Sequence, residues 1–119
     1  MFSITIGTEK QVAYANDIIH NPIANVDKKI EKIESDAVII AEKYGQRDKD
    51  LDIIPVLRNA ISYYEKTMDN SAEMLTADFV IKNYKENSSC FQRIMWKCLS
   101  HAFKEAGFSG ENVHNWASP

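Results

Sequence analysis

The sequence predicts an all-α fold, a compact bundle of about five helices in a single domain that covers residues 1–119. Two observations carry this prediction. Apolar residues recur every three or four positions along most of the chain, which places them on one face of a helix, and only four Gly and three Pro interrupt the pattern. The clearest apolar stripe consists of Val26, Ile30, Ile33, Ala37, Ile40 and Tyr44. A chain of this length typically buries roughly two-thirds of its unfolded surface, so we expect a core of its own.

The N-terminal segment, residues 1–7, is predicted to be an extended arm or strand. Residues 2–6 alternate apolar and polar side chains, as a strand does, but no second strand is evident to pair with them. Thr8 and Gln11 have the spacing of a capping box, in which each side chain satisfies a free backbone N–H of the first turn. A first helix should therefore start at Thr8 and end before Pro22, because proline displaces the preceding residue from the helical region.

The second helix is expected to run from about Ala24 to Tyr44 and to stop at Gly45. Its end is apolar on nearly every side between residues 37 and 41. We therefore expect Ile39 to be buried, either under the following helices or in a homodimer interface.

Two further helices follow after a polar loop. The third should be capped by Asp50 or Asp52, with Pro55 tolerated in its first turn. The fourth should start at Ser71 or Thr76, as one bent helix or two short ones.

The fifth helix opens with a second capping-box pattern, Ser89 with Gln92. Gly107 should end it with a left-handed cap, followed by an apolar contact. The tail, residues 109–119, holds Trp116 among polar residues. So large an apolar side chain is rarely left in water, and we expect Trp116 to dock on the domain or on a partner.

A cationic stripe on the fifth helix is the best organised candidate binding surface. Arg93, Lys97 and Lys104 share one side of this helix, His101 lies beside them, and Trp96 borders the apolar face. Such a stripe can bind phosphates with a stacked base or an acidic patch on another protein. The alternative is a solvated helix face with a half-buried tryptophan. The net charge of −3 argues against a dedicated nucleic-acid packager.

No metal or cofactor site is predicted around the acidic loop. Asp48, Asp50 and Asp52 imitate the start of a calcium-binding loop. However, Ile53 stands where such a loop requires Gly, and Asn59 stands where it requires a bidentate Glu. These aspartates are instead expected to solvate the loop and to cap a helix.

The histidines and cysteines predict no catalytic site either. Cys98, His101 and His114 lack the paired spacing of a structural zinc site. Both Cys90 and Cys98 are expected to be structural residues, although Cys90 falls in a first helical turn, where a helix dipole can lower the pKa of a thiol. The sequence contains no Gly-rich phosphate loop and no nucleophile motif, so it favours a non-enzymatic protein. The longest uncharged apolar run is far below the ~20 residues of a membrane span and no signal segment is evident, which predicts a cytoplasmic protein.

Residues 7–18, Gly-Thr-Glu-Lys-Gln-Val-Ala-Tyr-Ala-Asn-Asp-Ile, resemble the opening of a set of small proteins of phages and integrative elements in Gram-positive bacteria. Those proteins begin with a helix of Ser/Thr-Glu-Lys-Gln-hydrophobic-Ala-aromatic-Ala. Residues 77–84 are similar to a later aromatic-rich helix in some of them, although Phe79 and Val80 stand where the relatives often have tryptophan. The resemblance covers about a fifth of the chain.

The resemblance implies an accessory protein of a mobile element. Small proteins of that kind, including anti-CRISPR and other anti-defence inhibitors, commonly act by occupying a surface on a host protein. Lys10 and Tyr14 lie one turn apart on the surface of the matching helix, and they are candidate contact residues.

The sequence thus leads to a non-enzymatic, protein-binding accessory or inhibitor module whose partner is a host or element-encoded protein. The alternative is a nucleic-acid-binding regulator that uses the basic face of the fifth helix, although no recognition helix is identifiable. A homodimer is left open, and a membrane partner is not expected. The candidate partner-binding residues are Arg93, Trp96, Lys97, Lys104, Lys10, Tyr14 and Trp116.

Overall fold

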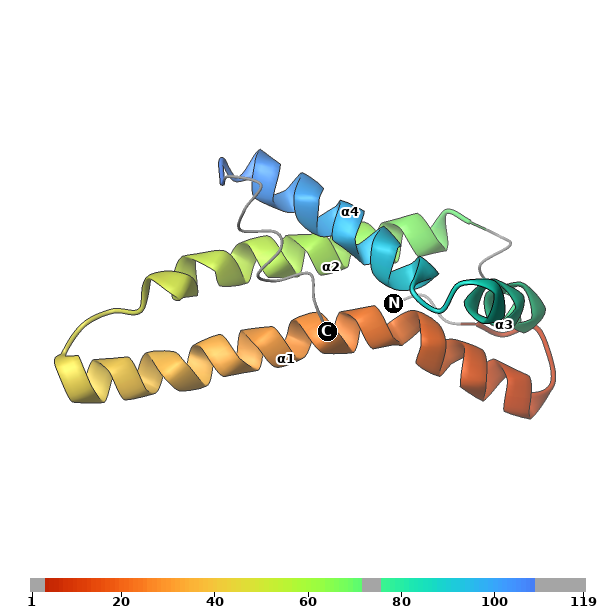
Figure 1. Ribbon diagram of the computed structural model, residues 1–119, viewed down its shortest axis with the longest axis horizontal. Helices are drawn as coiled ribbons and strands as arrows, with labels where there is room; N and C mark the ends of the chain where they lie inside the picture. The colour runs from red at the N-terminus through yellow and green to blue at the C-terminus, as the bar shows by residue number, and fades with distance from the viewer. Residues whose placement is uncertain (1–3, 72–75, 109–119) are drawn as a thin grey trace.

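The computed structural model describes residues 4–71 and 76–108. These ranges contain four α-helices and one short 3-10 helix (Figure 1): α1 (Glu9–Tyr44), η1 (Lys49–Ile53), α2 (Ile54–Asp69), α3 (Ala77–Glu86) and α4 (Cys90–Glu105). The all-α prediction is confirmed, with four α-helices in place of five. Thr76 precedes α3 as its N-cap, as one of the two predicted starts requires. The expected docking of Trp116 falls outside the described residues.

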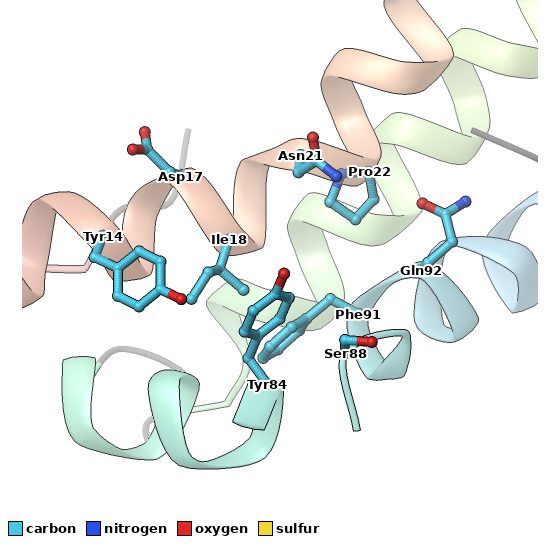
Figure 2. Close-up of a pocket in the computed structure, with 9 residues that line it drawn as sticks. All are labelled: Tyr14, Asp17, Ile18, Asn21, Pro22, Tyr84, Ser88, Phe91 and Gln92. Atoms are coloured by element: carbon cyan, nitrogen blue, oxygen red, sulfur yellow. The ribbon is translucent and has the colours of Figure 1, made fainter. Parts of the chain in front are cut away.

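The prediction that a helix ends before Pro22 is wrong. α1 is a single helix of 36 residues with Pro22 inside it, and its axis changes direction near this residue (Figures 1 and 2). A proline inside a helix removes one backbone N–H and its ring pushes against the carbonyl one turn earlier, which bends the helix. Ile19 and Ile23 are buried on either side of the bend. Their packing holds both halves in helical conformation although the local preference is to stop.

Tyr64 of α2 ties the bend to the rest of the fold. Its side chain is fully buried, and its hydroxyl donates a 2.6 Å hydrogen bond to the backbone carbonyl of Ile19, three residues before Pro22. Burial raises the pKa of Tyr64, so the hydroxyl keeps its proton and remains a donor. A single buried hydrogen bond thus connects the bend of α1 to a residue that lies far away in the sequence.

The core is one apolar cluster to which all four α-helices contribute. α2 and α4 cross closely on one side of α1, whereas α3 lies against the beginning of α1 (Figure 1). The largest fully buried side chains are Tyr64, Phe103, Ile4, Ile19, Leu57, Met68, Met95, Leu99, Val26 and Val80. No helix in the described ranges combines the length and the apolarity needed to cross a bilayer.

The described part of the N-terminal segment packs on α1 and on the start of α3. Ile4 is buried, and its backbone is paired with the amide of Asn16, which accepts from the Ile4 N–H at 2.8 Å and donates to the Ile4 carbonyl at 3.2 Å. Ile6 forms an isolated parallel bridge with Thr76, and its carbonyl accepts from the N–H of Ala77 at 2.9 Å. A side chain and a helix start therefore supply the partners that a second strand would offer.

Three predicted helix ends are confirmed. Thr8 and Gln11 form a complete capping box at the start of α1, and Gly45 ends that helix in a left-handed conformation. Gly107 is also left-handed, at φ 84°. The N–H of Phe108 bonds to the carbonyl of Phe103 at 2.9 Å, and the two rings pack edge to face, as expected for this type of cap.

Two predicted caps are wrong. Ser89 makes no side-chain cap on α4, and its hydroxyl and its backbone N–H both donate to the side-chain amide oxygen Oδ1 of Asn87. Neither Asp50 nor Asp52 caps the third predicted helix. The 3-10 helix η1 precedes α2, and Asp48 is the N-cap of η1. In both places an Asn or Asp two residues earlier accepts a hydrogen bond from the backbone N–H of an expected cap residue, Ser89 or Asp50, in a local turn.

Ile39 is not buried under the following helices, so that prediction is wrong. Its side chain is 53% exposed and that of Val38 is 57% exposed. The buried residues of α1 end at Ile33, because η1 and the start of α2 cover only one face of its distal end (Figure 1). The homodimer alternative for Ile39 stays a prediction.

Candidate binding sites

A cationic cleft of about 310 Å³ lies between α2 and α4. Two of its lining residues carry an ammonium group and none carries a carboxylate. Neither Lys66 nor Lys97 forms an ion pair with any other residue in the described ranges. The lining residues are Tyr63, Lys66, Thr67, Asn70, Lys97, Cys98 and His101. We refer to them as the α2–α4 cleft.

Glu105 holds two side chains of the α2–α4 cleft in place. The hydroxyl of Tyr63 donates to the carboxylate of Glu105, with distances of 2.9 and 2.7 Å to its two oxygens, and this bond raises the pKa of Tyr63. Nε2 of His101 lies 3.2 Å from the same carboxylate. The rings of Tyr63 and His101 pack edge to face, with centroids 4.7 Å apart. Phenol and imidazole are thereby fixed beside the two lysines.

The predicted cationic stripe contributes only one lysine to this cleft. Arg93, Lys97 and Lys104 are all exposed on α4, but only Lys97 is among the lining residues. Trp96 is 41% exposed, in keeping with a residue at the border of the core. Lys66 was missed, because the sequence does not reveal that α2 packs against α4.

The third predicted helix did contain a signal for the missing half of the cleft. One face of this helix carries polar and basic side chains, namely Lys66, Thr67 and Asn70, together with Tyr63. This pattern indicates a binding site only when it is known that α2 packs against α4.

A second cavity, of about 280 Å³, lies at the bend of α1 and is bounded by α1, the end of α3 and the start of α4 (Figure 2). We call it the bend pocket. Tyr14, a predicted contact residue, is one of its walls and is 46% exposed. Lys10, the other predicted residue of that helix, is exposed but does not line the pocket. The lining residues are Tyr14, Asp17, Ile18, Asn21, Pro22, Tyr84, Ser88, Phe91 and Gln92.

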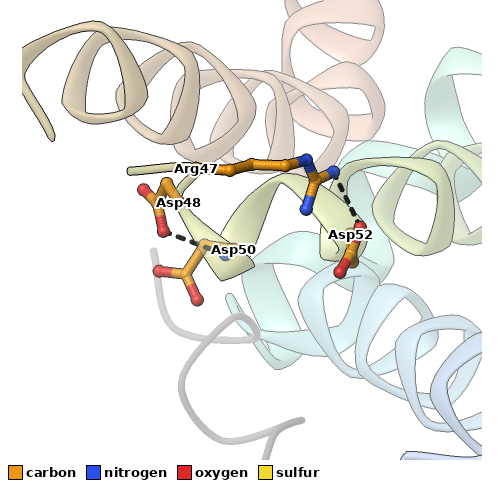
Figure 3. Close-up of polar contacts among 4 residues, drawn as sticks. All are labelled: Arg47, Asp48, Asp50 and Asp52. Atoms are coloured by element: carbon orange, nitrogen blue, oxygen red, sulfur yellow. Dashed lines mark hydrogen bonds and ion pairs between the residues drawn. The ribbon is translucent and has the colours of Figure 1, made fainter. Parts of the chain in front are cut away.

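The side chains of Asp48 and Asp52 have structural partners in the acidic loop (Figure 3). Asp48 accepts a 3.0 Å hydrogen bond from the backbone N–H of Asp50, and Asp52 forms a 2.8 Å ion pair with Arg47. No group of three or more potential metal ligands occurs in the part of the chain that the structure describes. These side chains therefore shape the turn into η1.

Both cysteines are free thiols, and the helix dipole does not lower the pKa of Cys90. Burial raises the pKa of Cys90 and outweighs the backbone hydrogen bonds and the Arg93 charge that act in the opposite direction. Burial likewise raises the pKa of Cys98, although a hydrogen bond with Thr67 opposes it. Raised pKa values make both thiols poor nucleophiles near neutral pH.

Comparison of the chain with protein-family models, with curated proteins and with solved structures found no match. The resemblance of residues 7–18 to proteins of mobile elements stays a prediction.

Proposed function

We propose that this chain is a non-enzymatic protein-binding module that docks on a partner through the α2–α4 cleft. The observation that supports this most is the charge of the cleft: the described residues that line it include two ammonium groups and an imidazole and no carboxylate. An Asp or Glu side chain of a partner would accept hydrogen bonds from Lys66 and Lys97, and bonds between charged groups are the stronger ones. Exposed cations around the cleft, such as Arg93, would steer the encounter with an acidic surface.

The dimensions of the cleft favour a protein over a nucleic acid as the partner. A cavity of about 310 Å³ accommodates one or two side chains, whereas duplex DNA presents a charge every ~1.7 Å along its axis and is bound by an extended series of cations. A nucleic-acid-binding regulator remains the second candidate, because Arg93, Lys97 and Lys104 are all exposed on α4.

The resemblance of residues 7–18 supports a more specific proposal. The module would be an accessory or inhibitor protein of a phage or mobile element, of the anti-CRISPR or anti-defence type. It would act in the cytoplasm of a bacterial host by occupying an acidic surface of a host or element-encoded protein. Such an inhibitor needs no catalytic group, because it acts by excluding another ligand from the surface that it covers.

Photo-crosslinking in the native host tests the proposal. A benzoylphenylalanine at Thr67, which lines the cleft, should give a covalent adduct with one protein through a peptide that contains Asp or Glu. The same substitution at Ser62, which is exposed on α2 outside the cleft, is the matched control and should give none. Adding Lys66→Glu and Lys97→Glu should abolish the adduct at Thr67. An adduct that survives both reversals, or one made only with nucleic acid, would contradict the proposal.

A further inference from the structure

The bend pocket is built mainly from aromatic and apolar side chains. Ile18, Pro22 and Phe91 are buried and form its base. Tyr14 from α1 and Tyr84 from α3 stand beside them, with ring centroids 6.4 Å apart and ring planes at 82° (Figure 2). Three aromatic rings from three different helices therefore surround one cavity.

The rim of the bend pocket is polar and carries one formal charge. Asn21, Ser88 and Gln92 supply amide and hydroxyl groups. Asp17 supplies a carboxylate at the outer edge, directed away from the rings of Tyr14 and Tyr84 (Figure 2). Asp17 is exposed and forms no ion pair with any residue in the described ranges. No Lys, Arg or His lines the cavity. The pocket thus offers negative charge, hydrogen-bond acceptors and aromatic faces, and no cation to balance them.

We propose that the bend pocket binds the guanidinium group of an arginine side chain presented by a partner protein. A guanidinium is planar, stacks on aromatic rings and carries five N–H donors, which suits a site that combines rings with amide and carboxylate oxygens. An anionic group would be repelled by Asp17. An aliphatic side chain would bring apolar atoms against the Asp17 carboxylate and remove water from it without providing a partner.

The bend of α1 creates this site. Tyr14, Asp17, Ile18 and Asn21 follow one another along one face of α1, and Pro22 places the bend at the end of that row (Figure 2). α3 and the start of α4 supply Tyr84, Phe91 and Gln92 from the other side. The site shares no lining residue with the α2–α4 cleft, so it does not depend on the function proposed for that cleft.

Peptide titration followed by NMR tests the inference. The probe is the capped pentapeptide Gly-Gly-Arg-Gly-Gly, and its control carries citrulline, which has the shape of arginine without the charge. The arginine peptide should give saturable shifts of the Asn21 and Gln92 side-chain amides in the millimolar range, as expected for a single anchoring side chain. The citrulline peptide should bind at least about tenfold more weakly, because the cation–π and carboxylate contacts are lost.

Two variants locate the binding. Asp17→Asn should weaken binding of the arginine peptide by about threefold to fivefold, as expected for one exposed ion pair. Asp27→Asn removes an exposed aspartate of the same helix outside the pocket and should leave the affinity unchanged. Both variants should unfold at the temperature of the unmodified protein. The inference is overturned by equal affinity for the citrulline peptide, by equal effects of the two variants, or by the absence of shifts at Asn21 and Gln92.

Discussion

The two ends of α4 form two sites of opposite charge. At its start, Phe91 and Gln92 face α1 across the bend pocket, where Asp17 is the charged residue. Further along, Lys97 and His101 face α2 across the α2–α4 cleft, where no carboxylate is present among the lining residues. The difference in charge between the two sites arises largely from the helix that packs against α4, because α1 contributes an aspartate and α2 contributes a lysine. The charges on a single helix therefore show only half of the residues that form a site.

This comparison suggests how each site can be changed alone. A substitution at or beside the residues that line one site should leave the other site unchanged, because the two sites share no lining residue. The variants below are ordered from the largest expected effect to the smallest.

Tyr64→Phe should have the largest effect on stability. The change removes the hydroxyl that bonds to the Ile19 carbonyl at the bend and leaves a buried carbonyl without that donor. We expect the free energy of unfolding to fall by about 1–3 kcal/mol, measured by denaturant titration. The NMR chemical shifts of the Asn21 and Gln92 side-chain amides in the bend pocket should change, whereas the chemical shifts of residues that line the α2–α4 cleft should not.

The matched control for this prediction is Tyr63→Phe. Its hydroxyl bonds to Glu105 at the surface, where water can replace the lost partner, so its effect on unfolding should be much smaller. If the two variants destabilise the protein equally, or if Tyr64→Phe has no effect, the buried hydrogen bond does not hold the bend as described.

Glu105→Gln should make the surroundings of the α2–α4 cleft more positive and leave the charge of the bend pocket unchanged. The substitution removes the carboxylate next to the α2–α4 cleft and keeps the shape of the side chain. An acidic peptide should therefore bind up to about threefold more tightly, as expected for an exposed charge, whereas the arginine peptide at the bend pocket should bind as before. Isothermal titration measures both affinities, and Glu31→Gln on α1 is the control. Weaker binding of the acidic peptide would show that Glu105 contributes to recognition by positioning His101.

Ile39→Glu should have the smallest effect. Because Ile39 is 53% exposed, the free energy of unfolding should change by less than about 0.5 kcal/mol. Ile30→Glu, in the buried half of the same helix, should destabilise the protein severely, since a carboxylate would be desolvated in the core. Thermal unfolding and sedimentation of both variants provide the measurement. If the protein is a dimer whose mass is halved by Ile39→Glu, the homodimer predicted from the sequence is correct.

The sequence predicted three helix ends that depend on neighbouring residues, although two other local predictions, the caps at Ser89 and at Asp50 or Asp52, were wrong. The capping box at Thr8 and the glycine stops at Gly45 and Gly107 need only a few adjacent groups, and all three are confirmed. The end at Pro22 failed because its local preference is overridden by packing and by a hydroxyl from a distant helix. The burial of Ile39 under the following helices failed because an apolar pattern does not show whether another element of the chain lies against it.

The candidate sites show the same limit. Lys97 and Tyr14 were found from the sequence, because each lies on the exposed face of a clearly periodic helix. Lys66, Asp17 and Tyr84 were not found, because their roles depend on which helices pack together. The bend pocket in particular requires α1 to continue past Pro22, which is the reverse of what the local sequence predicts.

The most direct test of the central claim compares how an acidic peptide and a nucleic acid bind the α2–α4 cleft. Pentaglutamate and random-sequence single- and double-stranded DNA are titrated against the protein at increasing salt. Lys66→Glu with Lys97→Glu is the test variant, and Lys82→Glu with Lys85→Glu on α3 is its charge-matched control. We predict that pentaglutamate binds, that the test variant weakens it at least about tenfold while the control does not, and that DNA binding is undetectable at about 0.15 M salt. Micromolar DNA binding that falls steeply with salt and disappears in the test variant would contradict the account and favour the nucleic-acid regulator.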